Sequence, residues 1–242
     1  MQFQDKIVVV TGAGQGLGAR FAEDFAAQGA VVMLLGRTLK KVEAVGDRIL
    51  ASGGRAKTFA CDVGDSADVA KVFSEIQSEY GHVDVLVNNA AIHKSISVVD
   101  TPVEEWDAQI RINLSGTFYC TKAVLKGMIE RRYGKIINIS SSAAKHFFPG
   151  FGAYAASKGG IVSFTHTLSE EVKRHNINVN AIYLGMTNTE HSRERIDSDP
   201  AITIKLDEMM QVDEVSRVVL FLASDDAAPI MGAAIDVFGK KS

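Results

Sequence analysis

A serine, a tyrosine and a lysine near the middle of the chain have the types and spacing needed to move a proton. Tyr154 and Lys158 are four residues apart, so on a helix their side chains share one face. A neighbouring ammonium should lower the pKa of the phenol from its ordinary value of about 10. Ser141 precedes Tyr154 by thirteen residues and adds a hydroxyl group. The pattern indicates a phenol that exchanges a proton with a substrate oxygen, although an ordinary surface pair of tyrosine and lysine has the same spacing.

The rest of the chain must supply a scaffold for these side chains, and its apolar pattern indicates which one. Short apolar segments rich in β-branched residues alternate with longer segments of helical periodicity. This alternation is typical of an α/β fold of the Rossmann type, a doubly wound, seven-stranded parallel sheet with helices on both faces. Strands are expected at residues 7–10, 31–35, 56–60, 83–87, 135–139, 177–182 and 234–238, and helices at 17–28, 39–52, 67–80, 103–132, 154–175 and 212–224.

One segment departs from this alternation. Residues 187–211 are polar and mixed in pattern, so we expect them to form a flap over the site, with a plain surface excursion as the alternative. No linker-like stretch divides residues 1–242, which predicts a single catalytic domain.

The composition argues against several classes of function. The net charge is −3 and the basic residues are scattered, so we expect no nucleic-acid partner. No apolar segment reaches the roughly 20 residues that span a bilayer, and the polar residues 1–6 lead straight into a strand, unlike a signal peptide. Cys61 and Cys120 have neither metal-ligand nor disulfide spacing, so we expect no metal, no membrane and a reduced, cytoplasmic setting.

A glycine-rich segment between the first expected strand and helix indicates a dinucleotide site. Residues 11–18 read TGAGQGLG, and glycines at this point let the backbone approach a pyrophosphate at the helix N-terminus. The strand before and the helix after make a tight turn without a ligand the weaker interpretation. The expected cofactor contacts in this segment are Gly12, Gln15, Gly16, Leu17 and Gly18.

The end of the second expected strand bears on the choice between NADP and NAD. An acidic residue there would hydrogen-bond the adenosine ribose and repel a 2′-phosphate, but the chain has Arg37 and Thr38. A guanidinium and a hydroxyl can bind that phosphate, which favours NADP(H). NAD(H) is the alternative, because Arg37 could face solvent and Gln15 is not the basic residue that would strengthen phosphate binding.

Two further strand ends could line the cofactor. Asp62 and Val63 follow the third expected strand, where the carboxylate could accept a hydrogen bond from the adenine amino group. Asn88, Asn89 and Ala90 follow the fourth, where a small alanine leaves room for the cofactor. Either segment could instead be a turn whose polar side chains bond the local backbone.

These motifs together resemble those of the short-chain dehydrogenase/reductase family over nearly the whole chain. The matching residues are TGxxxGLG at 11–18, Asp62, Asn88-Asn89-Ala90, Asn113, Ser141, Tyr154-xxx-Lys158 and Asn180-Ala181-Ile182. The resemblance implies hydride exchange between a nicotinamide and a carbinol carbon. It also implies roles: Tyr154 is the general acid and base, and Ser141 orients the same substrate oxygen. Lys158 holds the nicotinamide ribose and tunes the phenol, and Asn113 supports a water that relays protons.

The chain departs from the family pattern after the sixth expected strand. Leu184 stands where the family usually has proline, and Gly185 follows as usual. Because proline fixes φ, its loss should loosen one edge of the nicotinamide pocket. We still expect Gly185 and Thr187 or Thr189, with the backbone near Met186, to meet the cofactor.

The segment between Ser141 and Tyr154 lies where the resemblance places the substrate wall. Its phenylalanines indicate a small, mainly apolar or aromatic substrate, although any one of them could pack on the sheet or on a partner. Two histidines could bond a polar substituent or simply face solvent. The candidate substrate contacts are His93, Ala143, His146 and Phe148.

The leading interpretation is an NADP-preferring short-chain alcohol dehydrogenase or ketone reductase. The alternative within enzymes is a 3-oxoacyl-carrier-protein reductase, because Arg131, Arg132, Arg174 and His175 form a basic cluster at two helix ends. The helix dipole alone also favours cations there. A non-catalytic NADP(H)-sensing protein is the alternative of another class, disfavoured because the catalytic residues are all present. Broad apolar stripes on helices 103–132 and 154–175 predict a homotetramer or a dimer.

Overall fold

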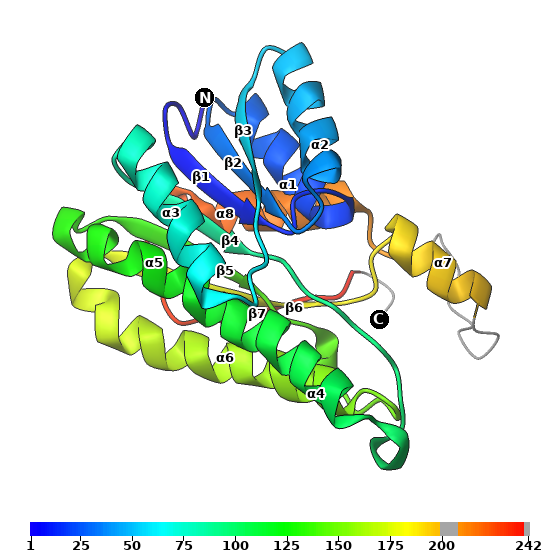
Figure 1. The fold of residues 1–242 in the computed structure, drawn as a ribbon. Coiled ribbons are helices and arrows are strands. Elements are labelled where there is room, and N and C mark those ends of the chain that lie inside the picture. The colour runs from blue at the N-terminus through cyan, green and yellow to red at the C-terminus, as the bar shows by residue number, and fades with distance from the viewer. Residues whose placement is uncertain (199–207, 240–242) are drawn as a thin grey trace.

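A computed structural model of the chain describes residues 1–198 and 208–239 (Figure 1). The seven expected strands all form and lie parallel in one sheet, in the order β3-β2-β1-β4-β5-β6-β7. The strand order reverses between β1 and β4, which is where ligands bind in doubly wound sheets, at the carboxyl ends of the strands. The strands are β1 (Ile7–Thr11), β2 (Val31–Gly36), β3 (Arg55–Ala60), β4 (Val85–Asn88), β5 (Gly134–Ile139), β6 (Ile177–Leu184) and β7 (Ala234–Val237).

Helices cover both faces of the sheet, as the alternating pattern predicts. Helices α1, α2 and α8 lie on one face, and α3, α5 and α6 lie on the other (Figure 1). Among the described residues, no helix is long and apolar enough to cross a membrane. The helices are α1 (Gly16–Ala27), α2 (Leu39–Ala51), α3 (Ser66–Tyr80), α4 (Val103–Gln109), α5 (Gly116–Arg131), α6 (Gly152–Val172), α7 (Glu190–Ser198) and α8 (Val212–Ala223).

The structure differs from the sequence-based expectation in two helical regions. The single helix expected over residues 103–132 is divided, because a π-helical stretch, Ile110–Ser115, joins α4 to α5. The segment 187–211, expected as a polar flap, contains α7, whose charged sequence gives no apolar face for periodicity to detect. The flap's middle, residues 199–207, lies outside the described residues.

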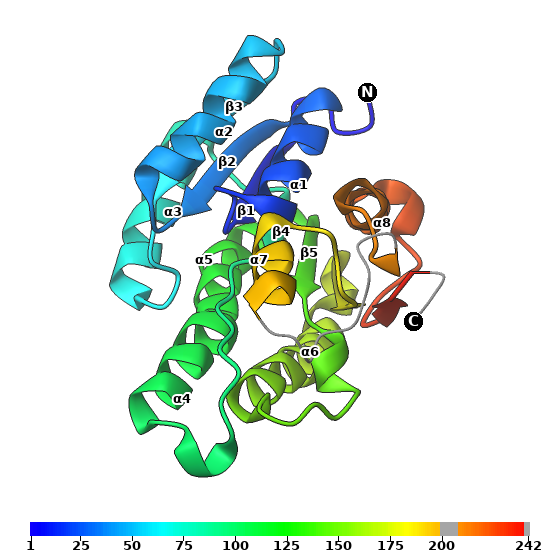
Figure 2. The same ribbon diagram turned by 90° about the vertical axis from the view of Figure 1, so that its right-hand side faces the viewer.

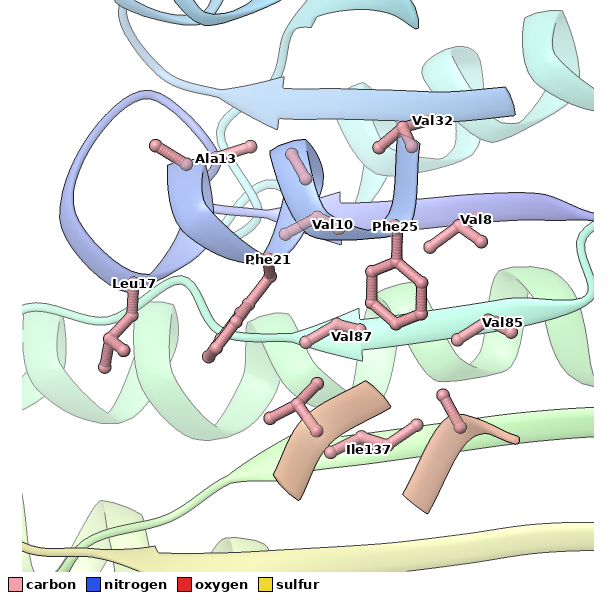
Figure 3. Close-up of a cluster of buried hydrophobic side chains, with 14 of the residues drawn as sticks. Val8, Val10, Ala13, Leu17, Phe21, Phe25, Val32, Val85, Val87 and Ile137 are labelled. Atoms are coloured by element: carbon pink, nitrogen blue, oxygen red, sulfur yellow. The ribbon is translucent and has the colours of Figure 1, made fainter. Parts of the chain in front are cut away.

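The core consists of two apolar layers, one on each face of the sheet. Side chains alternate along a strand, so Val8 and Val10 of β1 pack with Phe21 and Phe25 of α1 (Figure 3). Val9, between them, joins the opposite layer. This burial on both faces explains why the central strands β1, β2 and β4 are almost continuously apolar, and it makes the sheet a rigid base for the strand ends.

The first layer predicts a stability difference between two phenylalanines. Phe25 is fully buried, whereas Phe147 is 99% exposed. We expect Phe25→Ala to lower the free energy of unfolding by about 3–5 kcal/mol, because it leaves a cavity. The control Phe147→Ala should change it by less than about 0.5 kcal/mol. Urea unfolding measures both, and equal effects would contradict this packing.

Candidate active site

The glycine segment after β1 forms a tight loop that only glycine could build. Gly12 and Gly16 have φ values of +66° and +55°, a region that other residues rarely adopt. A Cβ on Gly18 would stand 2.2 Å from the carbonyl oxygen of Gly12. The first turn of α1 therefore packs directly on the end of β1, and the loop stays open in front of the helix N-terminus.

Hydrogen bonds fix this loop to the end of β4, at the point where the strand order reverses. The Asn89 amide donates to the carbonyl oxygens of Thr11 (2.9 Å) and Gly12 (3.3 Å). The Thr11 hydroxyl accepts from the backbone N–H groups of Asn89 and Ala90, each at 3.0 Å. Asn88 turns the other way and is buried, with its amide bonded to other core side chains. Asn89 thus holds the loop, and Asn88 supports the sheet.

This loop has the features that a cofactor pyrophosphate requires. The Gln15 side chain does not cap α1. The first turn, GLGA, has no carboxylate, so the backbone N–H groups at the helix N-terminus can meet an anion. Leu17 anchors the turn in the core. Thr189, at the start of the segment that leads into α7, has its methyl carbon 3.6 Å from where a Cβ of Gly16 would stand. The residues present therefore fit a dinucleotide.

A cation that the sequence analysis missed lies beside this loop. The Lys41 ammonium donates to the Gln15 side-chain oxygen (2.6 Å). The Cβ of Lys41 lies close to the loop, 2.9 Å from where a Cβ on Gly14 would stand. Arg37 is exposed just before α2, and the Thr38 hydroxyl does not cap that helix. The spacing of four residues between Arg37 and Lys41, at the start of a helix, could have indicated that both cations lie near the cofactor loop. The end of β2 thus combines cations, a hydroxyl and a helix N-terminus.

The carboxylate after β3 is already engaged in the structure. One Asp62 oxygen accepts from the Gly64 backbone (2.9 Å), and the other meets the Arg111 guanidinium at 3.4 Å. Val63 is buried against Gly116 at the start of α5. Asp62 keeps about a third of its side chain exposed, so its predicted contact with adenine stays open as a prediction.

The catalytic candidates meet where β5 ends against α6. The Lys158 ammonium is buried and donates to the carbonyl oxygen of Ile139 (2.6 Å), the last residue of β5. The Ser140 hydroxyl donates back to the carbonyl oxygen of Lys158 (2.9 Å). Burial lowers the pKa of Lys158 to about 7, because the charged form loses its hydration. The ammonium lies 5.7 Å from the centre of the Tyr154 ring.

Ser141 lies next to this junction and caps a short helical turn. Its side-chain oxygen accepts a hydrogen bond from the backbone N–H of Ala143 at 3.1 Å. Both residues are buried. The structure therefore brings Ser141 to the strand end that binds Lys158, on the same side of the sheet edge as the start of α6, which carries Tyr154.

Asn113 lies in the π-helical stretch and is fully buried. Its amide exchanges two hydrogen bonds with the backbone of Ile92, at 2.8 and 2.9 Å, and donates to Ser157 at 3.0 Å. The Ser157 hydroxyl in turn donates to the carbonyl oxygen of Tyr154 (2.7 Å). Asn113 thus connects the segment after β4 to the turn of Tyr154. Sequence reasoning gave no signal for Ser157, and the predicted water relay stays a prediction.

The strand that precedes the flap is longer than expected. Leu184 pairs with Val237, so β6 continues two residues beyond the expected end. The Gly185 N–H donates to the carbonyl oxygen of Val237 at 2.9 Å, and the loosened nicotinamide pocket expected from the loss of proline stays a prediction. Thr187 is buried and bridges to Met210, which brings the two ends of the flap together. Figure 2 shows α7 standing in front of the carboxyl ends of the strands.

The substrate candidates separate into two groups. The His93 ring lies 4.6 Å from the Tyr154 ring and 4.5 Å from the Phe151 ring, and the Phe148 ring is 5.4 Å from Phe151. His146 instead packs on Phe238 near the C-terminus, at 5.5 Å. The structure thus brings His93 to the tyrosine, along with Phe151 from the phenylalanine-rich segment expected to line the substrate.

The basic cluster lies at the opposite edge of the sheet. Arg131 ends α5 and pairs with the buried carboxylate of Asp84 at 3.0 Å. Arg132 donates to the carbonyl oxygen of Arg174, and His175 follows just before β6. These residues precede the amino ends of β5 and β6, whereas the glycine loop and Tyr154 lie at the carboxyl ends. Within one subunit the cluster is therefore not part of the site.

The buried lysine predicts a pH effect on stability. With a folded pKa of about 7, Lys158 releases its proton in the folded state while the unfolded chain keeps it up to about pH 10. The free energy of unfolding of the cofactor-free protein should therefore rise from pH 7 to pH 10 relative to that of Lys158→Met, by up to about 1.4 kcal/mol per pH unit. Urea unfolding across this range measures the difference, and parallel curves for the two proteins would contradict it.

Comparison with known proteins indicates the same family as the sequence motifs do, over nearly the whole chain. The model of the family described as short chain dehydrogenase matches residues 6–200. The 3-oxoacyl-[acyl-carrier-protein] reductase FabG of Escherichia coli (strain K12) is 36% identical over 242 residues, covering 99% of this chain and 98% of that protein. Subunit BbsD of (2S)-[(R)-hydroxy(phenyl)methyl]succinyl-CoA dehydrogenase from Thauera aromatica is 32% identical and covers 100% and 98%.

A solved structure is similar to this chain in both fold and sequence. The crystal structure of NAD+-bound xylitol dehydrogenase superimposes with a TM-score of 0.93 at 28% identity, covering 99% of this chain and 100% of that one. The sheet order, the glycine loop and the junction of Lys158 with β5 thus have a common explanation: the chain belongs to the short-chain dehydrogenase/reductase family of NAD(P)(H)-dependent oxidoreductases.

Proposed function

We propose that the protein interconverts a ketone and a secondary alcohol, prefers NADP(H), and acts on a small, mainly apolar or aromatic substrate. The observation that carries this proposal is the pair of hydrogen bonds between Lys158 and the end of β5. These bonds hold α6, and with it Tyr154, against the strand end that leads into Ser141. A proton donor and a second hydroxyl can then act on one substrate oxygen.

Each side chain has a distinct task in this reaction. The nicotinamide, when bound, supplies or accepts the hydride. Tyr154 gives its phenolic proton to the carbonyl oxygen during reduction and takes it back during oxidation. Ser141 already accepts from a backbone N–H group, so its hydroxyl hydrogen can donate to the same oxygen and stabilise the developing charge. Lys158 titrates near neutral pH and can return a proton to the phenolate.

The preference for NADP(H) is supported by the charges at the end of β2. The first turn of α2, which the structure describes in full, contains Lys40 and Lys41 and no acidic residue. Together with Arg37 and the Thr38 hydroxyl, they match the charge and hydrogen-bonding needs of a 2′-phosphate. NAD(H) is the competing choice, because the similar xylitol dehydrogenase was solved with NAD+ bound.

A 3-oxoacyl group linked to a carrier protein is the second candidate substrate. The similarity to FabG of Escherichia coli along 99% of the chain favours it. Turnover of a 3-oxoacyl thioester together with no turnover of simple ketones would select this candidate. Simple ketone reduction without thioester reduction would exclude it.

The proposed assembly is a homotetramer or a dimer. Phe118 on α5 is 43% exposed and lies 6.1 Å from the Phe164 ring on α6, which gives these two helices an apolar outer surface. Burial of such a surface against a second copy would stabilise the protein. The cytoplasmic location and the single-domain organisation stay predictions.

Replacing the proposed proton donor gives the main test of this function. We expect Tyr154→Phe to lower kcat/KM for ketone reduction by about 10²–10⁴-fold, because the general acid is lost. The dissociation constant for NADPH, measured by fluorescence titration, should stay nearly unchanged. Tyr80→Phe, which alters a tyrosine at the far end of α3, is the control and should keep full activity. Retained turnover in Tyr154→Phe would overturn the assignment. A wild-type protein that binds NADPH but reduces no ketone would favour the sensing alternative.

A charge reversal before α2 tests the cofactor preference. We expect the wild-type protein to bind NADPH more tightly than NADH and Arg37→Asp to weaken NADPH binding at least about tenfold, because the carboxylate repels a 2′-phosphate. NADH binding should change little. Arg174→Asp makes the same charge change at the opposite edge of the sheet and should leave both affinities unchanged. Equal wild-type affinity for the two cofactors would contradict the proposal.

A further inference from the structure

His93 is positioned against the catalytic tyrosine by its ring and its backbone. The imidazole lies edge to face on the Tyr154 ring, with ring centres 4.6 Å apart and an interplanar angle of 76°. The Phe151 ring packs on the imidazole at 4.5 Å and also contacts the Tyr154 ring, with ring centres 6.1 Å apart. A small molecule could therefore contact both the imidazole and the phenolic oxygen.

The backbone on both sides of His93 is held by the helix that follows. The Asn113 amide forms two hydrogen bonds with the backbone of Ile92, and the Gln109 amide donates to the carbonyl oxygen of Lys94 at 3.4 Å. Both amide side chains are buried. Asn113 thus holds the backbone next to His93, and its further bond to Ser157 connects this segment to α6.

The following residues are held by the loop before α6. The Ile96 N–H donates to the carbonyl oxygen of Gly150 at 2.9 Å, directly before Phe151. The segment 92–96 and the loop 148–151 therefore form one wall beside Tyr154. His93 lies in this wall, with the backbone held on both sides of it and its imidazole in contact with the Tyr154 and Phe151 rings.

His93 is the polar side chain of this wall that lies against the Tyr154 ring. The other rings beside it, Phe148 and Phe151, are apolar. The two lysines near this wall form ion pairs: Lys94 with Glu105 at 3.2 Å, and Lys145 with Asp236 at 2.7 Å. His146, the other candidate histidine, packs on Phe238 instead.

We propose that His93 determines substrate specificity by donating a hydrogen bond to a second oxygen of the substrate, close to the reacting carbonyl. Among ketones, the preferred substrates are then those with a neighbouring acceptor, such as a 3-oxo ester or 3-oxo thioester. Either protonation state of an imidazole has an N–H group to donate. This inference rests on the proposed ketone reduction and extends it to the choice of substrate.

Two ketones with the same number of non-hydrogen atoms test the inference. Ethyl acetoacetate has a second carbonyl near the ketone, and 2-octanone has none. The measured quantity is the ratio of their kcat/KM values with NADPH for the full chain. His93→Phe keeps an aromatic ring and removes the donor, so it should lower this ratio about tenfold, the size of one net hydrogen bond. His93→Gln keeps an N–H donor and should retain most of the wild-type ratio.

The control and the alternative outcomes separate this inference from the proposed function. Phe148→Leu changes the wall without removing a donor, so it should affect both ketones alike and leave the ratio unchanged. His93→Leu provides a second donor-free variant, and NADPH titration checks that each variant is folded. An equal loss for both ketones in His93→Phe and His93→Leu, or an unchanged ratio, would overturn the inference while ketone reduction stands. A wild-type protein that reduces neither ketone would overturn both.

Discussion

The active site depends on a buried lysine that joins a helix to the end of a strand. Lys158 donates to the carbonyl oxygen of Ile139, and Ser140 donates back to the backbone of Lys158. An ammonium is costly to bury, and the lowered pKa of Lys158 shows this cost. In return, the two hydrogen bonds fix the position of α6, which cannot slide along β5 without breaking them. Tyr154, one turn earlier on the same helix, and Ser141, two residues beyond Ile139, are therefore held at one place.

The second half of the site depends on an equally close contact between β1 and β4. The Asn89 amide holds the glycine loop, while Asn113 holds the segment that follows Asn89 and connects it through Ser157 to the backbone of Tyr154. These hydrogen bonds, joined by the short backbone segment 89–92, thus link the proposed pyrophosphate site to the helical turn that carries the proton donor. These links would hold a bound cofactor and the catalytic side chains at fixed relative positions. Hydride transfer between two carbons, together with proton transfer from Tyr154, requires such positioning.

Sequence reasoning predicted the parts of this account that depend on local pattern. All seven strands form, and the pattern is clearest in β1, β2 and β4, whose burial on both sheet faces makes them almost continuously apolar. It was less accurate where tertiary contacts decide. The π-helical stretch around Asn113 looks like ordinary helix in sequence, and α7 has no apolar face. Lys41 and Ser157 gain their positions from contacts between distant segments, which spacing along one element cannot show.

The central claim is that this site transfers hydride to a carbonyl carbon while Tyr154 supplies the proton. Its most direct test is a reduction with NADPH that carries deuterium in the transferred position at C4 of the nicotinamide. The account predicts that one deuterium appears on the carbinol carbon of the alcohol product, and that the product of the same reaction with Tyr154→Phe is nearly absent. Formation of alcohol without deuterium at that carbon, with all transferable C4 hydrogen labelled, would contradict it.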